Sequence, residues 1–282
     1  MTSADEYEIV IVKYGTRQGH RSEVYLNYNI YGQPDGPIGM DYYFWIVRNA
    51  ERTILVDTGF SKAGGENRKR TFLIDPAEAY RALGIDLDSE ITIVVTHAHY
   101  DHIGNLDLFP NARLVIAGSE YDFWTGEYGK RQQFRHSTED VEIAALAAAQ
   151  AEGRVETFSG TIELAPGIQL IELGGHTPGQ SVVRVATPDG DALLASDAIH
   201  YYEEYEDDLP FAYVQDLWKM YAGFDAIRAL MDSGVTHLVS GHDPDTLNRF
   251  TPVETGPLAG LAATIGHRGE NETDEGERRT AR

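Results

Sequence analysis

Strand-like runs separated by turns dominate the hydrophobic pattern of this chain. Expected strands cover residues 8–13, 42–47, 53–56, 91–95, 113–116, 168–173, 181–186, 192–195 and 237–240. Two of them, 42–47 and 53–56, are joined by a short polar segment, as in a β-hairpin. The run 91–95 consists of β-branched residues, which is typical of a buried strand, and it leads directly into a histidine-rich segment.

Helices are expected between and after these strands. One helix begins with Asp75 as its N-cap and Pro76 at its first helical position, an arrangement that favours helix initiation. The expected helices cover residues 75–83, 120–124, 138–151 and 215–231, and the expected loops cover 21–41, 64–70 and 126–136. Two strand-rich halves, each followed by helices, predict an α/β fold in which two sheets pack face to face with helices outside.

The chain contains no internal linker rich in glycine, serine or proline. A single domain over residues 1–265 is therefore expected. From residue 266 to residue 282 the sequence is charged and almost free of apolar side chains. Such a composition cannot form a core, so this tail is expected to be disordered.

Charge and composition limit the classes of partner. The 282 residues include 45 Asp and Glu against 23 Lys and Arg, a formal net charge of -22, and no cysteine. This charge argues against nucleic acid and against anionic membrane surfaces as partners. No apolar run reaches the ~20 residues of a membrane span, and no signal peptide is evident. We therefore expect a cytoplasmic protein whose partner is a small molecule; a homodimer is compatible with the sequence.

Residues 97–102 carry three imidazoles and one carboxylate in the pattern His-x-His-x-Asp-His. These side chains suit zinc, iron and cobalt. In a loop at the end of a strand, two residues separated by one can face the same point, so His97 and His99 can chelate one ion. Asp101 and His102 can then turn toward a second ion. The hexapeptide predicts a metal site.

Three further candidate ligands stand at the ends of other apolar strands. They are His176, Asp197 and His242, each next to a small or turn-forming residue. Strand ends that converge on one edge of a fold are where a rigid scaffold presents functional groups. The remaining histidines lack this setting and are expected to be surface or structural residues: His20, His136, His237 and His267.

The complete set of motifs resembles the metallo-β-lactamase superfamily. The motifs are Asp57-Thr58-Gly59, residues 97–102, Gly175-His176-Thr177-Pro178-Gly179, Asp197 and Gly241-His242, in the superfamily's order within roughly residues 8–250. The resemblance implies an αββα four-layer sandwich and two divalent metal ions, with zinc expected and manganese, iron or cobalt as alternatives. It assigns one ion to His97, His99 and His176, the other to Asp101, His102 and His242, and the bridging position to Asp197. Asp57 would brace the ligand loop.

Two such ions can lower the pKa of a water molecule from 15.7 toward ~7, so that hydroxide attacks a polarised carbonyl. Within the superfamily, the absence of cysteine and the presence of Asp197 argue against class B β-lactamases, and His99 argues against flavodiiron proteins. The charge argues against the RNA-processing members. The chain is most similar to the N-acyl-homoserine lactonase branch. The likeness lies in residues 43–47, 54–59, 83–86, 196–198, 207–211 and 241–243. The resemblance implies hydrolysis of a lactone or a related small ester or cyclic amide.

One position departs from that branch. Its members carry a tyrosine that contacts the substrate three residues after the bridging aspartate, whereas this chain has His200, followed by Tyr201 and Tyr202. We expect His200, or else Tyr201 or Tyr202, to make this contact. Asp101 can act as a proton shuttle in addition to its role as a ligand.

Other functions share the same ligands. A thioesterase of the glyoxalase II type is the nearest alternative, but its glutathione or coenzyme A substrate requires a basic patch, and none stands out near the motifs. A mononuclear iron dioxygenase and a non-catalytic binding module are further alternatives.

Aromatic side chains could line an apolar pocket or pack in the core: Tyr25, Tyr28, Tyr31, Tyr42, Tyr43, Phe44 and Trp45. Residues 68–72, together with Phe123 and Trp124, are candidates to cover the mouth of the pocket.

Overall fold

The computed structural model describes residues 5–267, whose strands form two sheets. The large sheet has the order β13-β14-β1-β2-β3-β5-β6-β7, with β4 beside β1, and the small sheet has the order β12-β11-β10-β9-β8. The large-sheet strands are β1 (Glu8–His20), β2 (Pro37–Arg48), β3 (Thr53–Val56), β4 (Thr71–Phe72), β5 (Thr92–Val95), β6 (Arg113–Ala117), β7 (Val155–Phe158), β13 (Thr251–Pro252) and β14 (Ala262–Ile265). The small-sheet strands are β8 (Thr161–Ala165), β9 (Ile168–Glu172), β10 (Ser181–Val185), β11 (Ala192–Ser196) and β12 (His237–Ser240).

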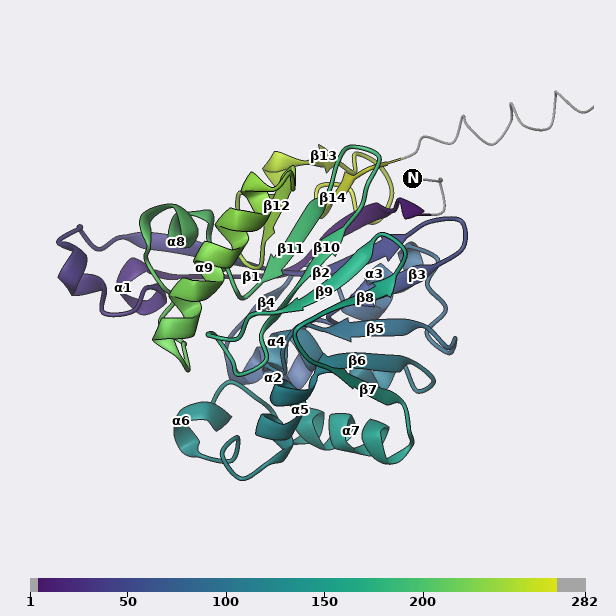
Figure 1. The fold of residues 1–282 in the computed structure, drawn as a ribbon, viewed down its shortest axis with the longest axis horizontal. Coiled ribbons are helices and arrows are strands. Elements are labelled where there is room, and N and C mark those ends of the chain that lie inside the picture. The colour runs from purple at the N-terminus through teal and green to yellow at the C-terminus, as the bar shows by residue number, and fades with distance from the viewer. Residues whose placement is uncertain (1–4, 268–282) are drawn as a thin grey trace, which may run out of the picture.

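Helices cover the outer faces of the two sheets (Figure 1). The α-helices are α1 (Arg21–Val24), α2 (Lys62–Asn67), α3 (Pro76–Ala82), α4 (Tyr100–Ile103), α5 (Gly118–Thr125), α6 (Gln132–Arg135), α7 (Asp140–Ala151), α8 (Tyr202–Asp207) and α9 (Leu217–Asp232). The 3-10 helices η2 (Tyr28–Tyr31), η3 (Leu106–Leu108) and η4 (Thr246–Arg249) lie in connecting segments. The helix predicted at Asp75 begins as expected, because the Asp75 side chain accepts hydrogen bonds from the backbone N–H groups of Ala77 and Glu78.

Three clusters of buried apolar side chains fill the three interfaces between four layers. One cluster joins the two sheets and includes Trp45 of β2 and Leu194 of β11. A second lies between the large sheet and its helices, with Tyr80 of α3 among its members. The third joins the small sheet to α9 through Phe224. The predicted αββα sandwich is therefore confirmed.

Burial of both faces explains why the strands read as continuous apolar runs rather than as alternating patterns. In β1, Ile9 and Ile11 belong to the cluster between the sheets. Their neighbours Val10 and Val12 belong to the cluster beneath the outer helices.

All three expected loops contain regular structure, and in the loop expected at 126–136 it is α6. The expected loop 21–41 begins with α1 and includes η2, and β2 starts within it at Pro37. The start of β2 pairs with the end of β1, which runs on to His20. This pairing was not foreseen because the segment is rich in turn-forming residues. The expected loop 64–70 overlaps α2, whose N-cap Ser61 accepts a hydrogen bond from the N–H of Gly64.

Several further short elements were not predicted: β4, β7, β8, β13, β14, α4 and α8. The strands β7 and β8 are only partly buried, so they lack the apolar runs on which the predictions depended. The expected disordered tail falls almost entirely on residues 268–282, outside the described residues.

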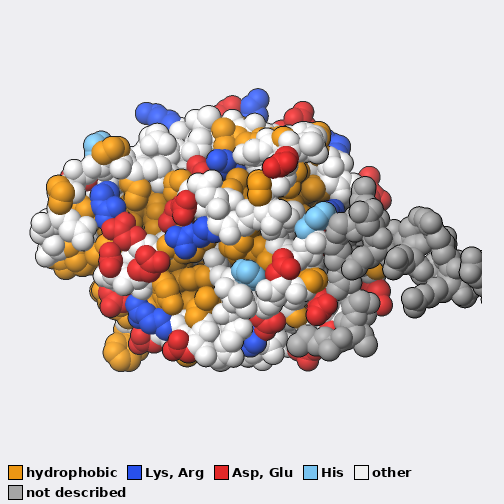
Figure 2. All heavy atoms as spheres, turned by 90° about the horizontal axis from the view of Figure 1, so that it is seen from above, with side chains coloured by type: hydrophobic (Ala, Val, Ile, Leu, Met, Phe, Trp, Pro, Cys, Tyr) orange, Lys and Arg blue, Asp and Glu red, His pale blue; other side chains and the backbone are white. Residues whose placement is uncertain are grey.

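Among the described residues, no helix is long and apolar enough to cross a membrane. On the face seen in Figure 2, acidic and basic side chains are interspersed with hydrophobic ones rather than gathered in a field of one sign.

A buried carboxyl group joins α2 to α7. Glu142 of α7 accepts a hydrogen bond from Ser61 Oγ at 2.7 Å, and its second oxygen has no hydrogen-bond partner among the described residues. Burial raises the pKa of Glu142 to about 7, against the smaller lowering by the Ser61 hydrogen bond. The folded state therefore binds this proton more tightly than the unfolded chain does. The contribution of protonated Glu142 to the stability of the folded state is lost as pH rises from about 4.5 through about 7.

We predict that Glu142→Gln stabilises the protein at about pH 8 by about 3 kcal/mol, because the pKa rises from 4.5 to about 7 and each pKa unit corresponds to ~1.4 kcal/mol. Near pH 4 the gain should nearly vanish, because the carboxyl is then mostly protonated in both the folded and the unfolded state. Urea unfolding at both pH values measures the effect. Glu163→Gln on the exposed side of β8 is the matched control for the change in net charge. An equal effect of Glu142→Gln at both pH values would contradict the prediction.

Candidate metal centre

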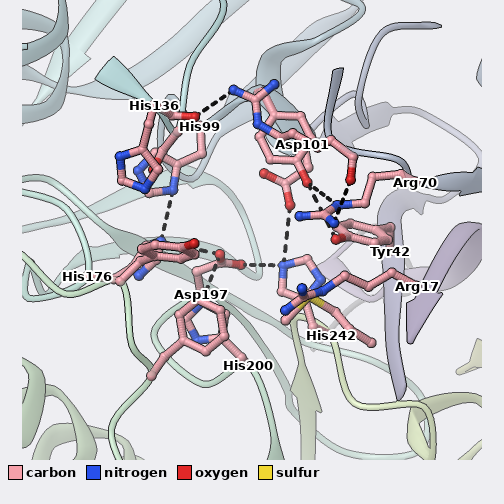
Figure 3. A pocket seen from close by; sticks show the side chains of 16 residues that line it. Arg17, Tyr42, Arg70, His99, Asp101, His136, His176, Asp197, His200 and His242 are labelled. Atoms are coloured by element: carbon pink, nitrogen blue, oxygen red, sulfur yellow. Dashed lines mark hydrogen bonds and ion pairs between the residues drawn. The ribbon is translucent and has the colours of Figure 1, made fainter. Parts of the chain in front are cut away.

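The seven predicted ligands come from strand ends in both sheets, and the fold brings all of them together. They are His97, His99, Asp101 and His102 after β5, His176 in the turn between β9 and β10, Asp197 after β11 and His242 after β12. All seven side chains are buried. Figure 3 shows that those it labels point toward a common centre beside the pocket.

Asp197 lies between two sets of histidines. Its Oδ2 lies 3.3 Å from Nε2 of His176 and 3.6 Å from Nε2 of His97. Its Oδ1 lies 3.2 Å from Nε2 of His102 and 3.1 Å from Nε2 of His242. The two oxygens of one carboxylate therefore face different sets of donor atoms, as a bridging ligand requires.

The donor atoms separate into two groups, and within each group they lie within 4.8 Å of one another. The first group contains His97, His99, His176 and Asp197, and the second contains Asp101, His102 and His242. Asp101 completes the second group. Its Oδ1 lies 3.9 Å from Nε2 of His102, and its Oδ2 lies 3.8 Å from Nε2 of His242. The division matches the one that the sequence resemblance implied.

These residues fit two divalent cations. Nε2 of His97, Nε2 of His102 and Oδ1 of Asp197 are buried and have no hydrogen-bond partner among the described residues. Leaving a buried polar atom unsatisfied costs about 1–3 kcal/mol, which a coordinated cation would offset. The donors are imidazole nitrogens and carboxylate oxygens, a set that accepts zinc, manganese, iron or cobalt.

Asp57 orients the ligand loop. Its Oδ2 accepts a hydrogen bond from Nδ1 of His102 at 2.7 Å, and its Oδ1 accepts one from the Thr96 N–H at 2.8 Å. His242 is held similarly, because its Nδ1 lies 2.8 Å from the carbonyl oxygen of Asp41. Such partners fix the ring so that Nε2 faces the ion.

Backbone geometry is unusual at two strand ends of the site. Asp57 and Ser196 have φ values of 60° and 46°, in the left-handed region. Gly241 passes so close to the Ser196 carbonyl that an added Cβ would lie 2.6 Å from that oxygen. Glycine is thus required where β11 and β12 converge next to His242.

Glu120 is a buried residue of the site that sequence reasoning missed. Its carboxylate accepts hydrogen bonds from the N–H of Ala98 at 2.8 Å, the N–H of Gly179 at 2.8 Å and the indole Nε1 of Trp124 at 2.7 Å. It therefore braces both the loop that carries His97 and the turn that carries His176. No sequence signal distinguishes this glutamate from a solvated helical one.

The cluster perturbs the pKa values of its imidazoles. Burial lowers the pKa of His97 and His99, and it lowers that of His176 to about 3. These three rings are therefore neutral, the form that coordinates a metal. Burial opposes protonation of His102 too, but the carboxylates of Asp197, Asp57 and Asp101 together raise its pKa. The same negative charges would favour a cation in place of that proton.

A family model described as the metallo-beta-lactamase superfamily matches residues 39–242. The chain belongs to the metallo-beta-lactamase superfamily. The matched range includes every strand end that carries a predicted ligand.

Relatives within this superfamily include N-acyl homoserine lactonases. The Bacillus sp. enzyme is 26% identical over 212 residues, which cover 70% of this chain and 75% of the relative. The enzyme AiiA from Bacillus thuringiensis subsp. kurstaki is 26% identical over 196 residues, covering 64% of this chain and 72% of the relative.

Solved structures of the superfamily share the fold. A quorum-quenching N-acyl homoserine lactone lactonase superposes with a TM-score of 0.71 at 21% identity, covering 87% of this chain and 95% of its own. AidC, a dizinc quorum-quenching lactonase, superposes with a TM-score of 0.69 at 21% identity, covering 95% and 97%.

His200 lies beside the ligand cluster. Its Nε2 lies 3.1 Å from Asp197 Oδ2, and its ring stacks on Phe211 with centroids 3.6 Å apart. The buried carboxylate of Glu204, one turn along in α8, lies 3.2 Å from Nδ1 of His200. Burial opposes protonation, but Asp197 and Glu204 together raise the pKa of His200 to about 9. Glu204 is a second residue that the sequence did not reveal.

Tyr201 is not placed for the substrate contact that was expected of it. Its hydroxyl donates to the carbonyl oxygen of Gly39 at 3.0 Å, and its ring packs near that of Tyr25. Consecutive residues at this bend point in different directions, so His200 faces the pocket and Tyr201 faces the large sheet.

Three arginines line the pocket above the cluster, which corrects the expectation that the site lacks a basic patch. They are Arg17, Arg68 and Arg70, from β1 and from the segment between α2 and β4. Figure 3 shows Arg17, Arg70 and Tyr42 on one side of the pocket, with His136 and His176 on the other. Arg17 lies far from the motifs in sequence, so its position could not be read from their neighbourhood.

Most of the aromatic candidates belong to the core. Tyr42 lines the pocket, whereas Tyr43 and Trp45 fill the space between the sheets. Trp124 lines an adjoining smaller pocket. His136, expected to be a surface or structural histidine, is exposed but also lines both pockets.

We predict that Asp57→Asn weakens metal binding by about 10–100-fold, because it removes the carboxylate that orients His102. Asparagine tolerates the left-handed backbone of this position, so the substitution tests the carboxylate rather than the turn. Competition with a chromophoric chelator measures the affinity. Asp86→Asn, at an exposed turn, is the matched control. Unchanged affinity in Asp57→Asn would show that the His102 ring needs no such partner.

Proposed function

We propose that this protein is a two-metal hydrolase that opens the ring of lactones related to N-acyl homoserine lactones. The position of Asp197, with one oxygen toward each group of histidines, is the observation that carries the proposal. The similarity to N-acyl homoserine lactonases supports the choice of a lactone as substrate. The dizinc relative supports zinc as the metal.

His97, His99 and His176 would hold one ion, Asp101, His102 and His242 would hold the other, and Asp197 would bridge them. When bound, two divalent cations supply a nucleophile at neutral pH, by lowering the pKa of water, and polarise the substrate carbonyl. The chain itself contributes orientation. Asp57 and Glu120 hold the ligand loops, and burial keeps bulk water from competing for the donor atoms.

His200 is the residue that we assign to contact the substrate, in the place of the tyrosine of the lactonase branch. Its Nε2 lies 3.1 Å from Asp197 Oδ2, and among the described residues it has no hydrogen-bond partner, although His200 lines the pocket. Glu204 fixes the ring from the opposite side. A protonated His200 would donate a hydrogen bond from Nε2 to the oxygen of the opening ring. Asp101, on the other side of Asp197, is the candidate proton shuttle.

A glyoxalase II-like thioesterase is the second candidate. The pocket arginines favour it, because glutathione and coenzyme A thioesters are anionic. A panel of lactones and thioesters, assayed by acid release and by thiol release, separates the two functions.

We predict acid release from lactones that depends on metal. Chelation should abolish it, and restored zinc should recover it. Asp197→Asn should lower kcat by about 100-fold or more, since it removes the shared carboxylate. Acid release that survives chelation, or turnover confined to thioesters, would contradict the proposal.

The role of His200 is tested by two substitutions that differ from each other only in a hydroxyl group. His200→Phe should lower kcat by about 100-fold, the usual magnitude for loss of a positioned proton donor. His200→Tyr restores a hydroxyl donor and should recover most of that loss. Metal content, measured by mass spectrometry, should stay the same in both. Equal activity of the Phe and Tyr variants would argue that His200 serves only to fill space.

A further inference from the structure

Two of the pocket arginines have no acidic partner. Within the described part of the chain, no carboxylate oxygen lies within 4.0 Å of a guanidinium nitrogen of Arg17 or Arg70. Arg68, the third, differs because it pairs with Glu139. Acidic residues outnumber basic ones by 45 to 23, so arginines without a carboxylate beside a common pocket call for an explanation.

The pairing of β1 with β4 brings the two arginines to the same pocket. In this antiparallel pair, Gly15 lies opposite Phe72 and Thr16 lies opposite Thr71. Arg17 follows the last paired residue of β1, and Arg70 directly precedes β4, so both chain segments leave the pair at the same end. Two cations beside one pocket repel each other, and a bound anion would remove that repulsion.

The guanidinium groups retain unused donors. Nε of Arg70 donates to the Tyr100 hydroxyl at 2.9 Å, and its Nη1 donates to the Arg68 carbonyl at 2.9 Å. Nε of Arg17 contacts Sδ of Met40 at 3.3 Å. Among the described residues, Nη2 of Arg70 and both terminal nitrogens of Arg17 donate to no protein acceptor. Arg70 is thus held in place by its neighbours, while Nη2 of its guanidinium group stays available to a ligand.

Both arginines reach the pocket from the side of Tyr42 and His242 (Figure 3). Neutralising the ligand carboxylates is an alternative role for them. The charge of Asp101 interacts with that of Arg70. Among the described residues, however, neither Asp101 nor Asp197 forms an ion pair with either arginine, and metal ions would neutralise these two carboxylates directly. The arginines are therefore better placed to meet a charge that arrives with the substrate.

We propose that Arg17 and Arg70 bind a carboxylate on the substrate, so that the preferred substrate is a lactone carrying a negative charge. This inference rests on the proposed lactone hydrolysis. An arginine fork matches the two oxygens of a carboxylate, whereas N-acyl homoserine lactones are neutral. The pocket volume of about 150 Å³ suits a compact substrate, since pockets for larger ligands measure roughly 300–1,000 Å³.

The test compares two substrates of similar shape that differ in charge, γ-carboxamido-γ-butyrolactone and γ-carboxy-γ-butyrolactone, on the zinc-loaded protein. The measured quantity is the ratio of kcat/KM for the anionic lactone to that for the neutral one. In Arg17→Gln and in Arg70→Gln this ratio should fall by about tenfold or more, mainly through KM. Arg70→Lys keeps the charge but loses the planar guanidinium group. Its ratio should therefore lie between those of the wild type and Arg70→Gln. Arg81→Gln, exposed on α3, is the matched control and should stay within about twofold of the wild type.

Binding without turnover separates this inference from the proposed function. Tetrahydrofuroate has the ring and the carboxylate but no ester, and calorimetry measures its affinity for the same zinc-loaded proteins. Binding should weaken by about tenfold in Arg17→Gln and Arg70→Gln, with zinc content unchanged.

The outcomes are distinct. If no lactone is hydrolysed but tetrahydrofuroate binding depends on both arginines, the lactonase proposal fails and the anion site stands. If lactones are hydrolysed and neither the specificity ratio nor tetrahydrofuroate binding responds to the substitutions, the anion site is overturned. Loss of zinc from the arginine variants would also overturn it, because it would assign these residues to charge balance at the metal centre.

Discussion

The geometry of the site depends on a buried junction at Thr96. Its Oγ1 lies 2.7 Å from Asp57 Oδ2 and 2.8 Å from Ser196 Oγ, and its carbonyl accepts the Ser181 N–H at 3.0 Å. These contacts join β3 and β5 of the large sheet to β10 and β11 of the small one. The left-handed backbones of Asp57 and Ser196 cost of order 1–3 kcal/mol each, which the buried hydrogen bonds help to offset. Because His97 follows Thr96 and Asp197 follows Ser196, this junction sets the spacing between ligands from the two sheets.

Each of the two sheets supplies part of the ligand set. The large sheet supplies His97, His99, Asp101 and His102, and the small sheet supplies His176, Asp197 and His242. Bound metal would therefore connect the two halves of the sandwich as well as serve chemistry, and folding and metal binding should be linked. The rim of the pocket has a different task. Its arginines and aromatic residues are not metal ligands. Substitutions of these residues can therefore change substrate specificity without disturbing the contacts of Thr96.

The fold and the ligand set could be predicted from sequence because their signals are local. His97 to His102 form one compact pattern, and Asp197 and His242 each follow an apolar strand. Other residues carry no local signal. Glu120 and Glu204 are recognisable only from what they contact after folding. Arg17 lies 80 residues before His97 and reaches the pocket because the end of β1 pairs with β2 and runs beside β4. Tyr201 was expected at the site because it follows His200, but adjacent residues at a bend can face opposite sides.

Anomalous diffraction from crystals of the zinc-loaded protein, recorded on both sides of the zinc edge, would locate the metal ions. A two-metal centre should give two zinc peaks per chain, about 3.5–4 Å apart. One should lie among His97, His99 and His176, the other among Asp101, His102 and His242, with one oxygen of Asp197 toward each. A single peak, or two peaks that Asp197 does not join, would contradict the two-metal centre.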